Sequence, residues 1–347
     1  MTSASEKSKL RVAVIGCGAI GALHATGITG SPDAELVGVL DTDANRADAL
    51  ARKCSTVSAR SLDELFDRTA PNAVTIATPD DAHREPSLAA IERGLHVFCE
   101  KPLAMTSPEA AEIVEASDRH GVKLAVDYNR RFGFGYQTAK RLIDEGRVGQ
   151  VRNVTIQVSD RVPPPAVIRS PDVMLTTLLI HHFDLVEHLG APVVEVLARS
   201  SSPVATPKSG DNDLLREITV ASLLENGALA TIVGSYRDRL SRTSEWTSIG
   251  GETGSVSVRD VTREVRLTLD DVDETTLLTP NLFAEGDAFE ATIVAHVQDF
   301  VARLRDRREV SVSGRVAWQG TLIVEAARES LALGRSVEVP RIKPIGR

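Results

Sequence analysis

The first third of the chain alternates between short apolar runs and longer amphipathic stretches. Five runs rich in β-branched residues are almost continuously apolar, which is typical of strands buried on both faces of a parallel sheet. These runs lie at residues 11–15, 36–40, 73–77, 96–99 and 123–126. Helical stretches separate them, at about residues 19–30, 43–53, 81–93 and 107–120. The regular alternation of strand and helix predicts a doubly wound α/β domain.

Beyond about residue 130 the pattern changes to strict alternation of apolar and polar positions. It is clearest at residues 153–158, 255–259 and 265–270, and it is typical of an antiparallel sheet covered on one face. Helical stretches that can supply the cover lie at about residues 172–189, 287–306 and 314–334. We therefore predict two domains: a doubly wound parallel sheet over residues 1–130, and an α+β domain with a largely antiparallel open sheet over residues 131–347.

A glycine-rich turn joins the first predicted strand to the first predicted helix. Gly16, Gly18 and Gly21 match the pattern GxGxxG, and Ala19 and Ile20 complete the turn. In this context the first glycine permits a tight turn, the second lets a pyrophosphate approach the backbone, and the third lets the helix pack closely on the sheet. The helix N-terminus then offers unpaired N–H groups to the phosphates. The turn predicts a Rossmann dinucleotide-binding site.

The second predicted strand ends at Asp41, about twenty residues after Gly21. A carboxylate at this position can accept hydrogen bonds from both hydroxyls of an adenosine ribose and repels a 2′-phosphate. No Arg or Ser follows it directly to bind that phosphate, and Arg46 lies five residues on. The sequence therefore favours NAD(H) over NADP(H).

Glu100, Lys101 and Pro102 directly follow the predicted strand at 96–99. In a doubly wound sheet, residues just past the carboxyl end of a strand lie at the cofactor crevice. Pro102 restricts its own φ and the conformation of Lys101 before it. A lysine held beside an oxidised nicotinamide can move a proton. An exposed charge pair at the end of a strand is the alternative interpretation of these residues.

Several motifs occur together in the order and spacing of one protein family. After the glycine loop come Thr78-Pro79 with His83, then Glu100-Lys101-Pro102, then Asn129-Arg130-Arg131-Phe132. On these residues the chain resembles the Gfo/Idh/MocA oxidoreductases, which include glucose–fructose oxidoreductase and inositol dehydrogenase. The resemblance extends over nearly the whole chain, through the turn at residues 312–314. It implies a nicotinamide-dependent oxidation or reduction of a sugar, amino sugar or cyclitol hydroxyl.

The resemblance also implies roles for individual residues. Besides the glycine loop and Asp41, the cofactor site would include Thr78, Pro79, His83, Glu100 and Lys101, with Glu100 facing the nicotinamide ribose. Lys101 would also contact the substrate hydroxyl, and the other substrate-binding residues would be Asn129, Arg131, Thr177, His181 and Asp184. The second domain would bind the substrate and use its open sheet face to form a homodimer or homotetramer.

A polar stripe marks the predicted helix at residues 172–189. Thr177, His181, Asp184 and His188 fall on one side of it, and burying such groups without partners costs a few kcal/mol. The resemblance implies that His181 transfers a proton. There are two alternatives. The two histidines and the carboxylate could form a metal site, or the stripe could be a structural row of hydrogen-bonded side chains. We expect no metal.

One position departs from the family pattern. The family usually has an aspartate where this chain has Thr177, and many members have a glycine triplet just upstream, where this chain has residues 171–173. Threonine can hydrogen-bond a sugar hydroxyl, but it cannot accept a proton at neutral pH. We therefore expect the substrate, or the way His181 is positioned, to differ from that of inositol dehydrogenase, with Asp184 compensating in part.

These observations support one preferred mechanism and two alternatives. In the preferred mechanism a sugar or cyclitol hydroxyl binds between the two domains. Lys101, His181 or both take its proton while a hydride leaves the same carbon for NAD⁺. In the first alternative, NAD⁺ is retained as a redox catalyst for an overall elimination or glycoside cleavage. In the second, the chain is a non-catalytic NAD(H)-binding regulator, which Thr177 favours and the presence of Lys101 and His181 disfavours.

Composition excludes several other function classes. The chain has 40 Lys+Arg against 48 Asp+Glu and only 4% aromatic residues, which disfavours a nucleic-acid partner. Its three cysteines, Cys17, Cys54 and Cys99, form no CxxC pair and predict neither a disulfide framework nor a cysteine zinc site. The N-terminus lacks a signal-peptide core and no apolar run reaches membrane-spanning length. We expect a cytoplasmic protein with no membrane partner.

Overall fold

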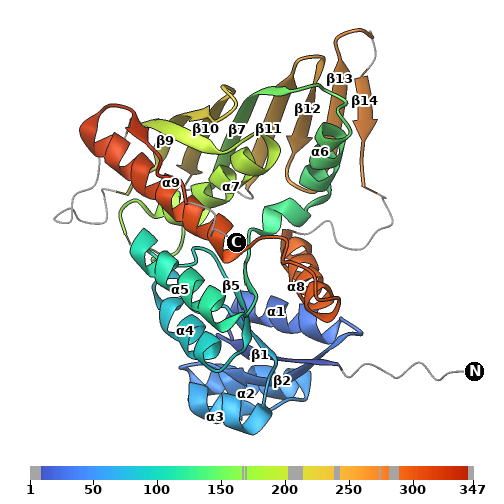
Figure 1. Cartoon of the computed structure of the whole chain (residues 1–347), viewed down its shortest axis with the longest axis vertical. Coiled ribbons are helices and arrows are strands. Elements are labelled where there is room, and N and C mark those ends of the chain that lie inside the picture. The colour runs from blue at the N-terminus through green and yellow to red at the C-terminus, as the bar shows by residue number, and fades with distance from the viewer. Residues whose placement is uncertain are drawn as a thin grey trace, which may run out of the picture. The chain divides into compact units, whose positions relative to one another are not determined.

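The chain divides into two compact units (Figure 1). The computed structural model describes residues 9–165, 168, 170–201, 214–237, 243–272, 275–280 and 289–342. The first unit contains the residues up to Asp127 together with Ile293–Ala317, and the second contains Tyr128–Thr292 and the residues from Trp318 on. Residues 293–317, which the sequence analysis assigns to the second domain, thus belong to the first unit.

A parallel sheet of six strands forms the centre of the first unit. The strands are β1 Leu10–Ile15, β2 Ala34–Leu40, β3 Ser58–Ala59, β4 Ala73–Ile76, β5 His96–Cys99 and β6 Leu124–Val126. Their order is β3-β2-β1-β4-β5-β6, and every neighbouring pair is parallel. The strand order reverses at β1, so the predicted doubly wound arrangement is confirmed.

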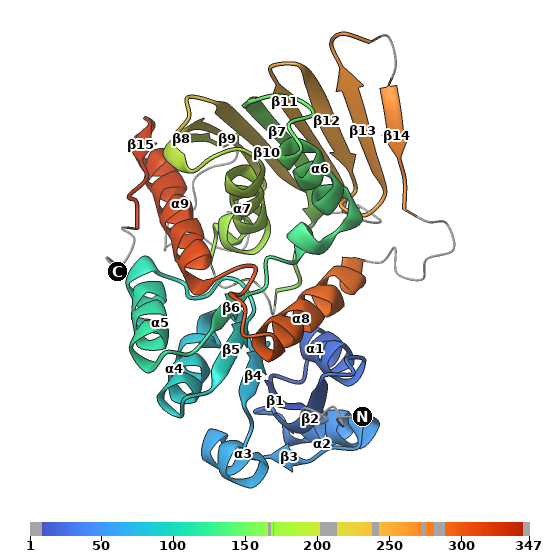
Figure 2. The same cartoon turned by 45° about the vertical axis from the view of Figure 1, so that its right-hand side comes forward.

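Helices cover both faces of this sheet. They are α1 Ala19–Thr29, α2 Ala44–Cys54, α3 Leu62–Thr69, α4 Arg84–Glu92, α5 Ser107–His120 and α8 Phe289–Arg305. Side chains of α1, α2 and α8 share one apolar core with β1 and β2, and Figure 2 shows α8 beside α1. The two helices approach closely at Gly27, where an added Cβ would lie 2.9 Å from Val297. This packing explains why α8 belongs to the first unit although it lies far along the chain.

The sequence analysis does not predict β3 or α3. A two-residue strand and an eight-residue helix are too short for hydrophobic periodicity to reveal them. A local signal was nevertheless present, because Ser61 caps α3 by accepting a hydrogen bond from the N–H of Glu64 at 3.1 Å. Glu64 in turn accepts one from the N–H of Arg60 at 2.8 Å. The Ser-x-x-Glu spacing is that of a capping box.

The second unit contains a sheet of nine strands among its described residues. They are β7 Val151–Arg161, β8 Val193–Arg199, β9 Glu217–Leu224, β10 Leu229–Arg237, β11 Ser244–Gly251, β12 Gly254–Arg259, β13 Glu264–Leu269, β14 Thr275–Leu278 and β15 Val337–Glu338. Their order is β14-β13-β12-β11-β7-β10-β9-β8-β15. All neighbours are antiparallel except β7 and β10, which pair in parallel. The predicted, largely antiparallel sheet is confirmed.

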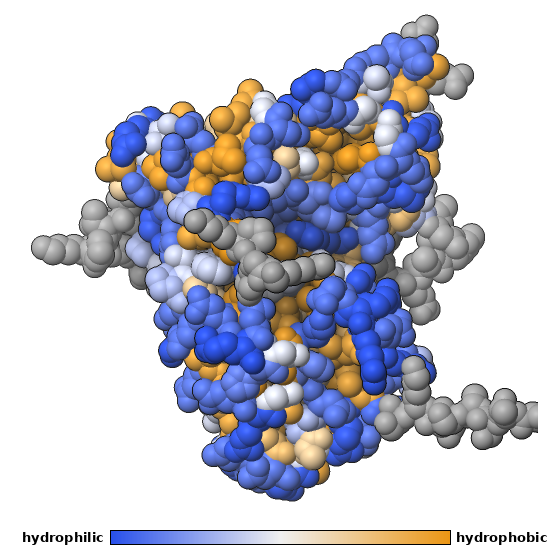
Figure 3. All heavy atoms as spheres, viewed as in Figure 1, coloured by the Kyte–Doolittle hydropathy of each residue, from blue (hydrophilic) through white to orange (hydrophobic). Residues whose placement is uncertain are grey.

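Helices cover one face of this sheet (Figures 1 and 2). They are α6 Phe134–Asp144, α7 Ile180–Leu189 and α9 Gly314–Leu333. Buried and exposed residues alternate along β9, as expected for a sheet with one covered face. The space-filling view shows hydrophilic residues predominating on the visible surface, with apolar residues between them (Figure 3). None of the described helices is long and apolar enough to cross a membrane.

The segment predicted as one helix at residues 172–189 is two structures in succession. Residues Met174–Leu179 form a π-helix, and α7 follows directly. A π-helical turn is wider than an α-helical turn. The predicted helix is therefore wider at its start than an α-helix, with Thr177 in the π-helical part and His181 in α7.

Candidate active site

The glycine loop has the geometry that a dinucleotide-binding turn needs. Gly16 has φ of +94°, where any side chain is strained, and a Cβ there would overlap the backbone of Ala77. A Cβ on Gly21 would overlap the carbonyl group of Gly16. At Gly18, the residue that precedes α1, a Cβ would meet no described atom within 4 Å. Gly18 therefore leaves open space before the helix N-terminus, the place where a dinucleotide-binding turn receives a phosphate. The exposed residues Ala19 and Ile20 follow it as the first turn of α1.

Asp41 lies beside this loop as an ionised and well-bonded carboxylate. It accepts hydrogen bonds from the N–H groups of Cys17 and Asp43, both at 2.7 Å, and from Arg46 Nη2 at 2.9 Å. Burial raises the pKa of Asp41, but these donors outweigh burial and the net shift is downward. The negative charge of Asp41 is thus held at the end of β2. The Arg46 contact is one that the sequence analysis missed.

Cys17, between the first two glycines, is a neutral thiol. Burial, followed by the charge of Asp41, raises its pKa to about 12. Such a thiol is inert as a nucleophile at neutral pH, so Cys17 serves as a small buried side chain in the loop.

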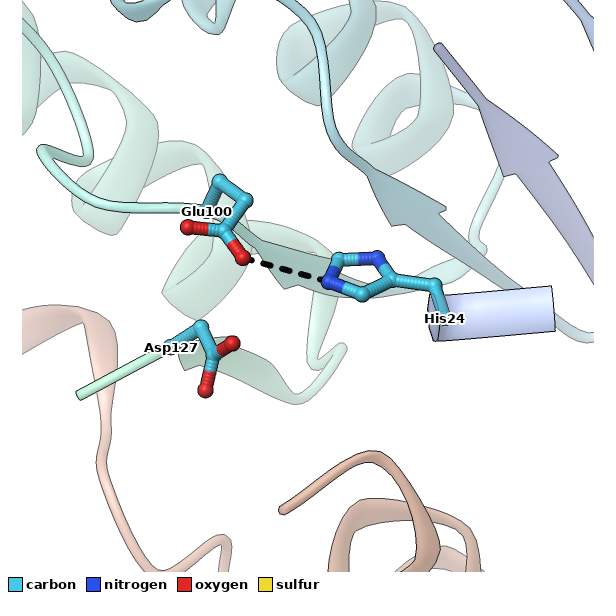
Figure 4. Close-up of side chains that lie close together, drawn as sticks. All are labelled: His24, Glu100 and Asp127. Carbon is cyan, nitrogen blue, oxygen red and sulfur yellow. Dashed lines mark hydrogen bonds and ion pairs between the residues drawn. The ribbon is translucent and has the colours of Figure 1, made fainter. Parts of the chain in front are cut away.

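Glu100, directly after β5, belongs to a buried cluster of four titratable side chains. His24 of α1 places Nε2 3.2 Å from Glu100 Oε1, and Asp127, which follows β6, lies close by, with ligand atoms of all three residues within 4.8 Å of one another (Figure 4). His296 of α8 completes the cluster, with Nδ1 2.7 Å from Asp127 Oδ1. The sequence analysis found only Glu100 of these four.

Glu100 and Asp127 shift one another's pKa in opposite directions. Burial raises the pKa of Asp127 well above its ordinary value, and the charge of Glu100 raises it further. For Glu100, burial raises the pKa but His24 and Lys101 lower it below the ordinary value. Asp127 is therefore the more readily protonated of the two carboxyl groups.

The same cluster is the one place among the described residues where three metal-ligating groups converge. Ligand atoms of His24, Glu100 and Asp127 lie within 4.8 Å of one another. His24 and His296 each pair with one of the two carboxyl groups, so both carboxyl groups already have a protein partner. Lys101 follows it directly, and its N–H donates to Glu100 Oε2 at 3.3 Å.

His83 connects the turns that follow β4 and β5. It is buried, with Nδ1 2.6 Å from the carbonyl oxygen of Pro102 and Nε2 3.0 Å from that of Thr78. Since both partners are acceptors, both ring nitrogens donate and the ring is an imidazolium. Burial lowers the pKa of His83, but Cys99, the Pro102 carbonyl group and Asp80 outweigh burial and raise it to about 9. His83 thus ties Thr78, next to the exposed Pro79, to the turn that holds Lys101.

In the second unit, Arg131 and Asp184 form a two-point ion pair. Arg131 Nε lies 2.8 Å from Asp184 Oδ2, and Arg131 Nη2 lies 2.5 Å from Oδ1. Burial raises the pKa of Asp184, while Arg131 opposes that shift. Nearby, Asn129 Nδ2 donates to Thr292 Oγ1 at 2.8 Å. The short 3₁₀ helix Asn129–Phe132 therefore places two candidate residues in buried polar contacts.

His181 is buried in the first turn of α7, with its ring edge toward Tyr128 at a centroid distance of 6.0 Å. Asp184, another residue of the predicted stripe, pairs both of its carboxylate oxygens with Arg131. Burial, helped by the charges of Arg131 and Lys140, lowers the pKa of His188 to about 3. With its carboxylate paired to arginine, the stripe offers a metal no acidic ligand. The structure thus gives the metal alternative no support.

Two domain models match this chain. Residues 10–128 match the one described as "Oxidoreductase family, NAD-binding Rossmann fold", and residues 136–257 match the "GFO/IDH/MocA C-terminal domain". Together the matched residues span more than half of the chain.

Several curated relatives are similar over long stretches. A myo-inositol 2-dehydrogenase of Thermotoga maritima is 27% identical, covering 96% of this chain and 99% of its own. A myo-inositol dehydrogenase of Streptomyces leeuwenhoekii is 31% identical over 64% of this chain and 69% of its own. A D-glucoside 3-dehydrogenase of Escherichia coli is 33% identical over 60% of this chain and 62% of its own.

Solved structures share the fold over nearly the whole chain. A levoglucosan dehydrogenase in complex with NADH and levoglucosan superposes with a TM-score of 0.85 at 23% identity, covering 96% of this chain and 100% of that chain. A probable dehydrogenase from Thermotoga maritima superposes with a TM-score of 0.82 at 25% identity, covering 95% of this chain and 99% of that chain. Together with the matched domains, these similarities show that the chain belongs to the Gfo/Idh/MocA oxidoreductase family and carries an NAD(H)-binding Rossmann unit.

Proposed function

We propose that this protein transfers a hydride between NAD(H) and the CH–OH or ketone carbon of a sugar, amino sugar or cyclitol. The observation that carries the proposal is the position of Lys101. Its neighbour Glu100 hydrogen-bonds His24 on α1, the helix that the glycine loop opens. Lys101 thus follows a strand end linked directly to the cofactor helix. The substrate class is supported by relatives named as inositol and glucoside dehydrogenases.

Lys101 and His181 are the proposed proton-transfer residues. When bound, NAD(H) supplies the hydride acceptor or donor. During oxidation the substrate hydroxyl must lose its proton as the hydride departs, and an amine or an imidazole can accept it. Lys101 is partly exposed beside the buried charge of Glu100, whereas His181 is held in α7. The reverse transfer of the proton accompanies ketone reduction.

The remaining residues predicted from the sequence have two kinds of proposed role: some contact the cofactor or the substrate, and others hold those residues in position. We propose that Gly18, Asp41 and Glu100 contact the cofactor, and that His83 acts by fixing the turns of Thr78 and Lys101. Arg131 and Asp184 would offer the substrate a bidentate pair, and Asn129 would orient the turn that bears Arg131. Thr177 would contact the substrate as a neutral hydroxyl, which favours a substrate different from that of an inositol dehydrogenase with aspartate there.

Turnover assays test this proposal and separate it from its alternatives. The purified chain is mixed with NAD⁺ or NADP⁺ and a panel of sugars, amino sugars and inositols, and with the reduced cofactors and the keto forms, while the absorbance of reduced nicotinamide is followed. Net formation of NADH supports the dehydrogenase. Product formation without net NADH indicates a retained redox cofactor, and NADH binding without turnover indicates a regulator.

We also propose that the chain forms a homodimer or homotetramer through the open face of its second sheet. Apolar side chains are exposed on β8, β9, β10 and β11 of this sheet, namely Leu197, Leu223, Leu229, Val233 and Trp246, and Leu223 pairs with Leu229 across β9 and β10. Exposed apolar side chains gathered on one sheet are typical of protein interfaces. The three cysteines are free thiols, which suits the reducing cytoplasm proposed as its location.

A further inference from the structure

A buried charged network lies in the second unit, and its central residue is Glu245 of β11. Glu245 Oε2 accepts from Arg130 Nε at 3.0 Å and from His182 Nε2 at 2.9 Å. Its Oε1 accepts from the hydroxyl of Tyr136 at 2.5 Å, and that hydroxyl also contacts Thr247 Oγ1 at 2.7 Å. The side chains of Arg130, Glu245 and His182 are 5%, 2% and 0% exposed. The network is therefore almost fully shielded from water.

The charge on Glu245 is maintained by its partners. Burial raises the pKa of this carboxyl, but Arg130 and His182 outweigh burial and the net shift is strongly downward. A buried ion pair contributes little net stability, since well-packed apolar residues often replace one without loss. Its hydrogen bonds are directional, however, and they fix the positions of the helices and strands whose residues form them.

Two of its partners each adjoin a residue of the proposed active site. Arg130 directly precedes Arg131 in the 3₁₀ helix Asn129–Phe132, and His182 directly follows His181 in α7. His182 Nδ1 also lies 3.0 Å from the carbonyl oxygen of Leu178, so both nitrogens of its ring are engaged. One carboxylate on β11 thus joins the two segments that present Arg131 and His181.

A second link connects the same two segments. Arg131 itself pairs with Asp184, one turn after His181 in α7. The 3₁₀ helix and α7 are therefore joined twice, once through Glu245 and once directly through Arg131 and Asp184. Two such links restrict both the distance and the rotation between these segments.

We propose that Glu245 is a positioning residue of the active site, acting on His181 through His182 and on Arg131 through Arg130. This inference rests on the proposed function of His181. Misplacing a catalytic group by about 1 Å can cost about 10²-fold in rate. Glu245→Gln keeps the shape of the side chain but removes its charge, so the Arg130 guanidinium loses its buried counter-ion and the bonds to Arg130 and His182 lose their charge assistance.

The experiment compares Glu245→Gln with Glu252→Gln in the full-length protein. Glu252 lies at the turn after β11, is 43% exposed and pairs with the surface residue Arg152. We expect Glu245→Gln to lower kcat by about 10- to 10²-fold while NADH affinity changes by less than about twofold. Glu252→Gln should match the wild type in both kcat and NADH affinity.

A double-mutant cycle separates positioning from a general structural role. In the His181→Ala background, Glu245→Gln should lower kcat by a smaller factor than in the wild type, because one of the two groups that it positions is gone. An undiminished effect of Glu245→Gln in that background would overturn the inference. If Glu245→Gln does not fold, His182→Gln, which leaves the Arg130–Glu245 pair in place, is tested in the same cycle with the same expected result.

The outcomes also distinguish this inference from the proposed function. Turnover that is lost in His181→Ala but unchanged in Glu245→Gln and His182→Gln overturns the inference alone. A wild-type protein without turnover on any polyol, or turnover unaffected by His181→Ala, overturns the proposed function of His181 and the inference with it.

Discussion

Arg46 pairs with Asp41, its Nη2 lying 2.9 Å from Oδ1, so this arginine is neutralised by the carboxylate that we propose binds the adenosine ribose. Replacing Asp41 by Ser removes the carboxylate and frees Arg46, which is half exposed, to meet a 2′-phosphate. We predict that Asp41→Ser lowers NADH affinity by about tenfold or more, as expected for lost hydrogen bonds to a charged group, and raises NADPH affinity. Fluorescence titration with each cofactor measures both.

The matched control for that change is Asp48→Ser. Asp48 lies on α2 and pairs with Arg60 instead of the cofactor loop. Its substitution should leave both affinities unchanged. An Asp41→Ser protein that keeps its full preference for NADH would refute the assigned role of Asp41.

His83 makes stability depend on pH in the alkaline range. Its folded pKa of about 9 exceeds the ordinary value of 6.5, so the protonated ring stabilises the fold fully below about pH 6.5. This contribution is lost as the pH rises through about 9. We predict that the free energy of unfolding falls by up to a few kcal/mol across this interval, as measured by urea denaturation.

Two histidine variants isolate this effect. His83→Gln cannot titrate and should lose the alkaline decline, whereas His120→Gln, at the exposed end of α5, should retain it. Equal pH dependence of the two variants would show that His83 is not the group responsible.

Two buried tyrosines offer a direct comparison of hydrogen-bonded and unbonded hydroxyls. Tyr136 donates to Glu245, whereas the buried hydroxyl of Tyr128 has no hydrogen-bond partner among the described residues. We predict that Tyr136→Phe lowers the free energy of unfolding by about 1–3 kcal/mol and Tyr128→Phe by less than about 0.5 kcal/mol. Chemical denaturation of both variants checks this, and a larger loss in Tyr128→Phe would disprove the assignment.

Assembly should depend on the exposed face of the second sheet. Leu229 on β10 is 60% exposed, and a charge there would oppose burial at an interface. We predict that Leu229→Glu shifts the protein to monomers in sedimentation velocity. Leu333→Glu, at a leucine that is 50% exposed at the end of α9, should not. An unchanged oligomer in Leu229→Glu would place the interface elsewhere.

The sequence predicts this molecule best where the chemistry is local. Gly16, Gly18 and Gly21 occupy one strand–turn–helix unit, and Asp41 ends the next strand, so their meeting follows from spacing alone. The Asp127–His296 contact joins residues far apart in the chain, and no local pattern reveals that α8 packs in the first unit. Similarly, Glu245 lies on a strand whose alternation gives no sign of a buried charge. The π-helical segment was missed because hydrophobic spacing does not distinguish it from an α-helix.

Lys101 provides the most direct test of the central claim, that this chain oxidises polyol hydroxyl groups with NAD⁺ and uses Lys101 to move the proton. The measurement is the initial rate of NADH formation with the best polyol of the panel, for the wild type and for Lys101→Ala, with NADH affinity determined in parallel. We predict that Lys101→Ala binds NADH within about twofold of the wild type and that its turnover is lower by about 10²-fold or more. Undiminished turnover in Lys101→Ala, or no NADH formation by the wild type on any polyol, would contradict the account.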